Sequence, residues 1–197
     1  MTSIAYPLDL SFKIIAIAPQ ISVTDAGGRL LLYVKQKAFK LKEKVTVFAD
    51  QEQTRPLYSI GADRIIDFQA QYDITTAAGG QIGAVKRRGM RSIWRAHYDV
   101  LRGGTPVLTI REANPWIKVL DHVLGELPVL GMLTGYAFNP AYLVARPDGT
   151  VVLRVQKQRA LWEGKYRVTK QAELASGEEE LALLGVLMML LLERTRG

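Results

Sequence analysis

The feature that most constrains the fold is a stretch near the C-terminus that is apolar on every side. Residues 181–192 contain no polar side chain, and the three glutamates Glu178–Glu180 stand immediately before them. Ser176 precedes Glu179 by three residues, which is the spacing of a helix capping box. We therefore predict a helix over about residues 178–194, with its acidic residues at the positive end of the helix dipole.

A helix that is apolar all round needs either protein or lipid on every side. Twelve apolar residues span roughly 18 Å at 1.5 Å per residue, which is well short of the ~30 Å hydrocarbon core of a bilayer. We therefore expect the rest of the chain to enclose this helix; the alternative is a transmembrane anchor, which would draw glutamates into the bilayer. The residues expected to form the structural core of the helix are Leu181, Leu184, Gly185, Leu187, Met188 and Leu191.

Three segments of the chain align with one another without gaps: residues 21–37, 72–88 and 142–158. Each segment has the pattern of a strand, a turn that contains glycine, and a second strand that ends in basic or polar residues. Gly28, Gly79 and Gly149 coincide in this alignment. Because glycine takes the left-handed backbone conformation that such turns require, the repeat predicts three similar β-hairpins.

Further strands fill the intervals between these hairpins. Alternating apolar and polar residues predict them over residues 11–18, 45–48, 57–60, 97–101, 107–110 and 162–168. Asn114-Pro115, followed by apolar residues at helical spacing as far as Gly125, predicts one additional short helix.

These elements predict a mainly β fold: a closed antiparallel β-barrel of about twelve strands, wrapped around the hydrophobic C-terminal helix. A barrel has no edge strands, and an enclosed helix fills a lumen too wide for side chains alone. A β-sandwich with the helix on one face would require a polar stripe on that helix, and residues 181–192 have none. We expect residues 1–197 to form a single domain.

The composition argues against most enzyme chemistry. The absence of cysteine excludes disulfides, thiolate metal sites and thiol nucleophiles. His97 reads as a strand residue and His122 as a residue of the short helix, while Asp63, Asp67 and Asp73 read as strand-end and turn residues. We therefore predict no catalytic residues, no metal and no cofactor. The N-terminus has no signal-peptide pattern, which favours a cytoplasmic protein.

Two basic clusters are the best candidates for a binding site. The net charge of +7 favours anionic partners, and the clusters leave two of the repeated hairpins at equivalent positions. In a barrel they would share a rim, although solvated surface charge is the simpler interpretation. The predicted anion-binding residues are Lys35, Lys37, Lys40, Lys86, Arg87, Arg88, Arg91 and Arg95.

Several stretches also carry a family resemblance, namely residues 33–43, 61–68, 89–98, 114–116 and 135–143, together with the C-terminal helix. They resemble the LURP-one-related branch of the tubby-like superfamily, which is related to phospholipid scramblases. The resemblance implies a closed barrel around a hydrophobic C-terminal helix. Tubby proteins bind phosphoinositide head groups, but none of those positions can be matched here. The chain also lacks the cysteine cluster of scramblases.

Together, these observations predict a non-enzymatic binding or regulatory module that takes anionic phospholipid or phosphorylated head groups at the membrane surface. The alternative is a structural scaffold with a protein partner, and a third interpretation is a scramblase-like activity. Nucleic acid is disfavoured because no aromatic-rich RNA-binding strand is present. The sequence does not specify an oligomeric state.

Overall fold

The computed structural model describes residues 4–13, 20–35, 44–62, 70–88, 96–113, 141–158 and 163–194. These residues form twelve strands and one helix. Their bounds are β1 (Leu8–Lys13), β2 (Gln20–Thr24), β3 (Leu30–Lys35), β4 (Val45–Phe48), β5 (Pro56–Ala62), β6 (Gln71–Thr76), β7 (Gln81–Arg87), β8 (His97–Arg102), β9 (Thr105–Glu112), β10 (Ala141–Ala145), β11 (Val151–Gln158), β12 (Glu163–Lys170) and α3 (Ser176–Arg194).

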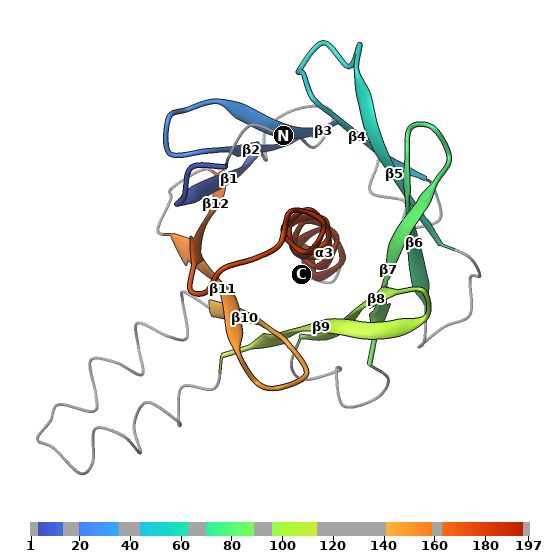
Figure 1. The fold of residues 1–197 in the computed structure, drawn as a ribbon. Helices are drawn as coiled ribbons and strands as arrows, with labels where there is room; N and C mark the ends of the chain where they lie inside the picture. Colours follow the sequence, from blue (N-terminus) through green and yellow to red (C-terminus); the bar gives the residue numbers. More distant parts are fainter. Residues whose placement is uncertain are drawn as a thin grey trace, which may run out of the picture.

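The twelve strands close into one antiparallel barrel in which each strand pairs with its neighbours in the chain (Figure 1). The ring closes where β1 pairs with β12, with Leu8 opposite Val168. Apolar side chains alternate along the strands, so that one side of each strand is buried; Leu8, Leu10 and Phe12 of β1 are all at most 2% exposed. The predicted closed barrel of about twelve strands is confirmed.

The three repeated hairpins share their detailed geometry. Gly28, Gly79 and Gly149 have φ values of 79°, 89° and 90°, all in the left-handed region. In each hairpin the glycine N–H donates to the carbonyl oxygen three residues earlier, over 2.9–3.0 Å. Each first strand also shifts register at the same aligned position, as between Val23 and Thr24. The sequence repeat is therefore a repeat of structure.

The two rims of the barrel differ because neighbouring strands run in opposite directions. The turns β2–β3, β4–β5, β6–β7, β8–β9 and β10–β11 all lie at one rim, which we call the turn rim. The helix α3 follows β12 and starts at this rim. The opposite end of the barrel, the far rim, holds the end of α3, where the Tyr98 hydroxyl donates a hydrogen bond to Glu193.

Figure 1 shows α3 in the middle of the ring of strands. Every residue from Leu181 to Leu192 other than Gly185 is at most 7% exposed. Two glycines bring the helix close to one side of the wall. A Cβ at Gly185 would meet Val100 of β8 at 2.9 Å, and a Cβ at Gly83 of β7 would meet Leu181 at 2.6 Å. The helix therefore packs most closely against β7, β8 and β9.

The start of α3 is held by charged side chains from the turn rim. Arg146, in the β10–β11 turn, donates two hydrogen bonds to the Glu178 carboxylate, over 2.6 and 2.7 Å. Arg102 donates to the Gly177 carbonyl over 2.6 Å. These contacts join the first turn of the helix to two of the hairpins. They therefore hold the start of the helix in position relative to the barrel wall.

Several sequence predictions differ from the structure in position. Strand β1 covers Leu8–Lys13, while residues 14–18 of the predicted strand and the predicted helix over residues 114–125 lie outside the described residues. The capping box is displaced by one residue: the Ala175 N–H donates to the Glu178 carboxylate, and the Ala175 carbonyl accepts from Glu179. Helix α3 accordingly begins at Ser176, two residues before the predicted start.

Replacing Gly83 by alanine should destabilise the fold by about 1–3 kcal/mol, because the new methyl would overlap packed atoms. It would lie 2.5 Å from the Leu101 carbonyl oxygen, which is backbone and cannot move aside. Gly61→Ala is the matched control, since among the described residues its methyl would contact only Lys44, at 3.6 Å. Urea denaturation measures both; equal midpoints for the two variants would contradict the close approach at Gly83.

Leu184→Asp or Leu187→Asp should prevent folding. Both leucines are 1% exposed, and an unpaired carboxylate buried among apolar side chains has no hydrogen-bond partner to offset its desolvation. Ala175→Asp, at an exposed position just before α3, should be tolerated. Soluble yield and cooperative thermal unfolding by circular dichroism report the result. Leu187 lines neither cavity of the described residues, so a folded Leu187→Asp protein would contradict the enclosure of α3.

The Arg146–Glu178 pair should make stability depend on pH. The two hydrogen bonds from Arg146 hold the pKa of Glu178 below its usual 4.5. This contribution is therefore present above about pH 4.5 and is lost as the pH falls through the lowered pKa. Arg146→Met should lower stability at pH 7 and flatten the decline below pH 4.5. Arg167→Met is the control, because it breaks a half-exposed pair with Asp9. Parallel pH curves for wild type and Arg146→Met would refute the assignment.

Candidate functional site

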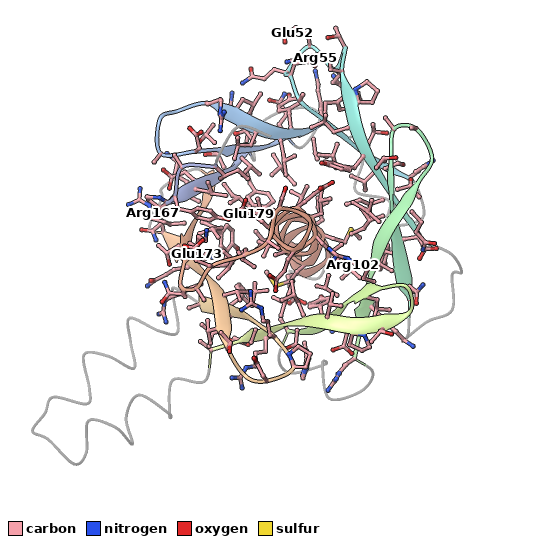
Figure 2. The ribbon with its side chains drawn as sticks, in the orientation of Figure 1. Glu52, Arg55, Arg102, Arg167, Glu173 and Glu179 are labelled. Atoms are coloured by element: carbon pink, nitrogen blue, oxygen red, sulfur yellow. The ribbon has the colours of Figure 1, made fainter. Side chains whose placement is uncertain are left out.

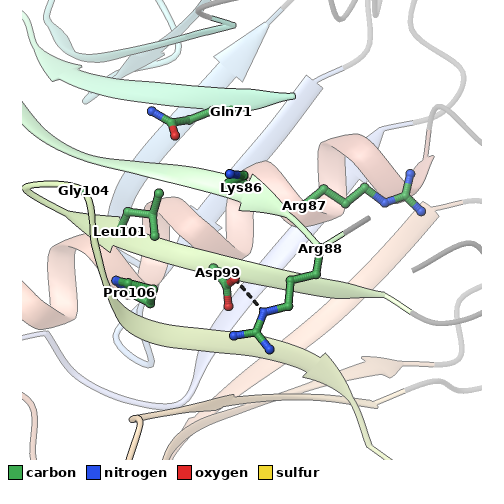
Figure 3. Close-up of a pocket in the computed structure, with 8 residues that line it drawn as sticks. All are labelled: Gln71, Lys86, Arg87, Arg88, Asp99, Leu101, Gly104 and Pro106. Carbon is green, nitrogen blue, oxygen red and sulfur yellow. Dashed lines mark hydrogen bonds and ion pairs between the residues drawn. The ribbon is translucent and has the colours of Figure 1, made fainter. Parts of the chain in front are cut away.

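One of the two basic clusters lies at the end of β7, where the strand alternates between the inside and the outside of the barrel. Val85 is fully buried in the core, so Lys86 and Arg88 lie on the outer wall. Arg87 lies on the inner side of the strand, near Tyr72. Burial raises the pKa of Tyr72, and the positive charge of Arg87 acts in the opposite direction and lowers it. Figure 3 shows the Arg87 side chain extending away from that of Arg88.

The outer wall of β6–β9 carries a cavity of about 380 Å³ beside this cluster. Strands β6, β7 and β8 and the turn into β9 supply its walls (Figure 3). Its lining residues are Gln71, Lys86, Arg87, Arg88, Asp99, Leu101, Gly104 and Pro106. Lys86 and Arg88 thus bring two outward-facing basic side chains to this cavity, whereas the side chain of Arg87 extends away from it.

Asp99 is the acidic partner in this cavity. It stands opposite Lys86 in the β7–β8 register, and its Oδ2 accepts a 2.7 Å hydrogen bond from the Arg88 Nε. Asp99 is only 8% exposed, and its Oδ1 is buried without a hydrogen-bond partner among the described residues. The Arg88 side chain, by contrast, is 54% exposed. A buried carboxylate therefore anchors a guanidinium that remains available to solvent.

The electrostatic character of the cavity is positive, since two cationic side chains, Lys86 and Arg88, and one carboxylate, Asp99, face it. His97 lies on the same outer face of β8. Burial and the charges of Arg88 and Arg111 lower its pKa below 6.5, against the opposing effect of Asp99. This shift favours the neutral form of the imidazole. As predicted, His97 is a strand-edge residue, the first of β8.

Lys35, the one described residue of the other predicted basic cluster (Lys35, Lys37 and Lys40), lies on a different part of the barrel. Lys35 ends β3 and is exposed at the far rim, as the ends of β3 and β7 share that rim. Four strand spacings separate β3 from β7, or roughly 19 Å along the wall. Lys35 does not line the 380 Å³ cavity. The remaining predicted anion-binding residues, Lys37, Lys40, Arg91 and Arg95, lie outside the described residues.

The other candidate groups form no second site within the described ranges. Asp73 of β6 accepts hydrogen bonds from Gln71 and Gln81, which is a structural role on the wall. Asp63, Asp67 and His122 lie outside the described residues. No group of three histidine, aspartate or glutamate side chains suited to a metal occurs in the described part of the chain. Across the same ranges, no helical segment has both the length and the hydropathy needed to cross a bilayer.

Asp99 is the residue of this site that sequence reasoning missed. The sequence contained a signal for it: Asp99 is a carboxylate between two core residues, Tyr98 and Val100, on the strand that follows the basic residues at positions 86–95. Its pairing with Arg88 depends on the β7–β8 register, which the sequence pattern does not specify.

Comparison with known proteins agrees with this architecture. The chain superposes on an X-ray structure of an Arabidopsis thaliana protein with a TM-score of 0.51 and 17% sequence identity, over 98% of this chain and 93% of that one. At this identity the likeness shows the fold alone. A search of curated proteins gives no match. Residues 30–169, most of the barrel, match the LURP-one-related family, as the sequence resemblance predicts. The chain therefore belongs to the LURP-one-related family.

Proposed function

We propose that this protein is a non-enzymatic binding module that holds the phosphate of an anionic phospholipid head group at a cytoplasmic membrane surface. In this proposal the barrel keeps its hydrophobic helix inside as a permanent core, and the outer wall makes the membrane contact. The observation that carries the proposal is the 380 Å³ cavity on the outer wall in which Lys86 and Arg88 come together beside Asp99.

The chemistry of the cavity suits a phosphate. The exposed guanidinium of Arg88 presents planar N–H donors that match two phosphate oxygens, while Lys86 supplies a point charge beside it. Asp99 holds the Arg88 Nε and leaves the terminal nitrogens of the guanidinium to a ligand. An arginine positioned in advance loses less side-chain entropy on binding than a free one.

The same cavity disfavours nucleic acid. Proteins that bind single strands stack bases on aromatic rings along an extended basic groove. None of the eight described residues that line the cavity is aromatic, and the volume suits a single phosphorylated group. The only acidic residue of the lining, Asp99, is held in an ion pair, which leaves it poorly suited to act as a general base. A binding role therefore fits the lining better than an enzymatic one.

Lys86→Gln should weaken binding to anionic vesicles about fivefold, because one basic side chain near an anionic surface contributes about 1 kcal/mol. Lys13→Gln is the matched control: Lys13 is an exposed lysine at the end of β1, six strands away on the opposite side of the barrel. Co-sedimentation with vesicles that contain phosphatidylserine, compared with phosphatidylcholine alone across a salt series, measures the affinities. Lysine-to-glutamine changes at these surface positions should leave the unfolding temperature unchanged.

The comparison separates the proposed site from general surface charge. Equal losses for Lys86→Gln and Lys13→Gln would contradict a defined site and leave only diffuse attraction by the net charge. Binding that ignores lipid charge and salt would point to insertion of the helix. If the wild-type chain binds no vesicle, the proposal fails, and a scaffold that binds a protein partner becomes the better interpretation of the function. Lys35→Gln in the same assay tests whether the two clusters act together.

A further inference from the structure

A second cavity of about 440 Å³ lies at the turn rim, between the hairpins β2–β3 and β4–β5 and the first turns of α3. It is remote from Lys86, which lies on the outer wall. Figure 2 shows Glu179 beside the start of α3, inside the ring, and Arg55 on the β4–β5 hairpin. The lining residues are Ile4, Arg29, Leu30, Leu31, Leu32, Ala49, Arg55, Leu57, Tyr58, Ser176, Glu179, Glu180, Leu183 and Leu184.

The position of α3 accounts for this cavity. Gly83 and Gly185 let the helix approach β7, β8 and β9, which leaves space on its other side. Glu180, Leu183 and Leu184 lie on one face of α3 at helical spacing and line that space. The wall there is also the most weakly paired part of the barrel, because β3 and β4 share a single register pair, Tyr33 with Phe48.

The inner part of the cavity is apolar. Leu183 and Leu184 of α3 are 6% and 1% exposed, and Leu31 and Leu57 pack from the two hairpins onto the core. Apolar walls on both sides favour a ligand with a hydrocarbon part, since such a ligand removes further apolar surface from water.

The polar part of the cavity is acidic, because its two arginines are already engaged. Arg29 pairs with Asp25 at 3.0 Å and Arg55 with Asp50 at 3.5 Å, each within its own turn. Glu179 lies near Lys170, whose pKa it helps to raise. The neighbour of Glu180 is the phenol of Tyr58, which is neutral; burial first, and then Glu180, raise the pKa of Tyr58. Glu180 lines the cavity, and none of the ion pairs found among the described residues includes it.

We infer that this cavity binds a small amphipathic amine, with the hydrocarbon part against Leu57, Leu183 and Leu184 and the ammonium on the Glu180 carboxylate. The ammonium would supply the cation that the described surroundings of Glu180 lack. The uncharged Tyr58 hydroxyl lies beside that carboxylate and can take part in the same hydrogen-bond network. This site is independent of the proposed phosphate site.

Octylamine, octanol and butylamine are suitable probes for the purified full-length chain, studied by titration calorimetry at pH 7 below their aggregation limits. We expect octylamine to bind, octanol to bind at least about tenfold more weakly because it carries no charge, and butylamine to bind weakly because it fills little of the apolar part. Equal binding of octylamine and octanol, or no binding of octylamine at millimolar concentration, would overturn the inference.

Glu180→Gln is the decisive variant, since it removes the charge and keeps the shape. It should weaken octylamine binding at least about tenfold and leave octanol binding unchanged. Glu173→Gln is the control, because Glu173 is an exposed glutamate at the same rim and does not line the cavity. An unchanged octylamine affinity in Glu180→Gln would refute the assignment.

Leu57→Trp tests the apolar part by filling it, and binding of all probes should be lost while thermal unfolding stays cooperative. If that variant does not fold, nuclear magnetic resonance of the wild-type chain decides the point: octylamine should shift the Tyr58 signals, and their failure to shift would contradict the location. Lys86→Gln should leave octylamine binding intact, so this inference and the proposed function can fail separately.

Discussion

Removal from water of the apolar side chains of α3 is the interaction on which the rest of the structure depends. Each fully buried leucine or methionine contributes about 1.5–3 kcal/mol, and Leu181–Leu192 are buried almost without exception. A ring of twelve strands is too wide for its own side chains to fill, so the barrel lacks a continuous core without the helix. The helix in turn has no polar face to offer water. Neither the barrel nor the helix is therefore expected to be stable alone. Arg146 and Arg102 add polar contacts between the start of the helix and the hairpins.

The two glycines make this packing asymmetric. Because α3 lies against β7, β8 and β9, the helix packs directly behind the wall whose outer surface carries Lys86, Arg88 and Asp99. A binding site gains precision from such support. The opposite wall, where β3 and β4 share one register pair, is where space remains beside the helix. The off-centre position of α3 thus accounts for both features: it supports the wall that carries the proposed phosphate site, and it leaves space for the proposed amine cavity on the other side.

Local patterns predicted most of the fold. The turn glycines, the alternating strands and the apolar helix each depend on residues close together in sequence, so β4 agrees with its prediction residue for residue and Gly28, Gly79 and Gly149 share one conformation. The features that the sequence did not predict depend on strand register and on contacts between residues far apart in the chain. The Arg88–Asp99 pair requires the β7–β8 alignment, and the off-centre position of α3 depends on contacts between Gly83 and Leu181, almost one hundred residues apart. Lys86 and Arg88 reach one cavity because they lie two residues apart and so share one face of the chain. The second cavity collects residues from five separate segments.

The order of the elements along the chain also has a consequence for biosynthesis. All twelve strands precede α3, so the ribosome releases the entire wall of the barrel before the element that fills it. At about 5–20 residues per second, the apolar faces of the first hairpins remain uncovered for roughly ten to thirty seconds. During this interval the nascent chain exposes unpaired strand edges and apolar surface, both of which favour aggregation. We therefore expect chaperones to bind it. The helix that stabilises the finished protein is therefore also the step that ends its exposure to aggregation.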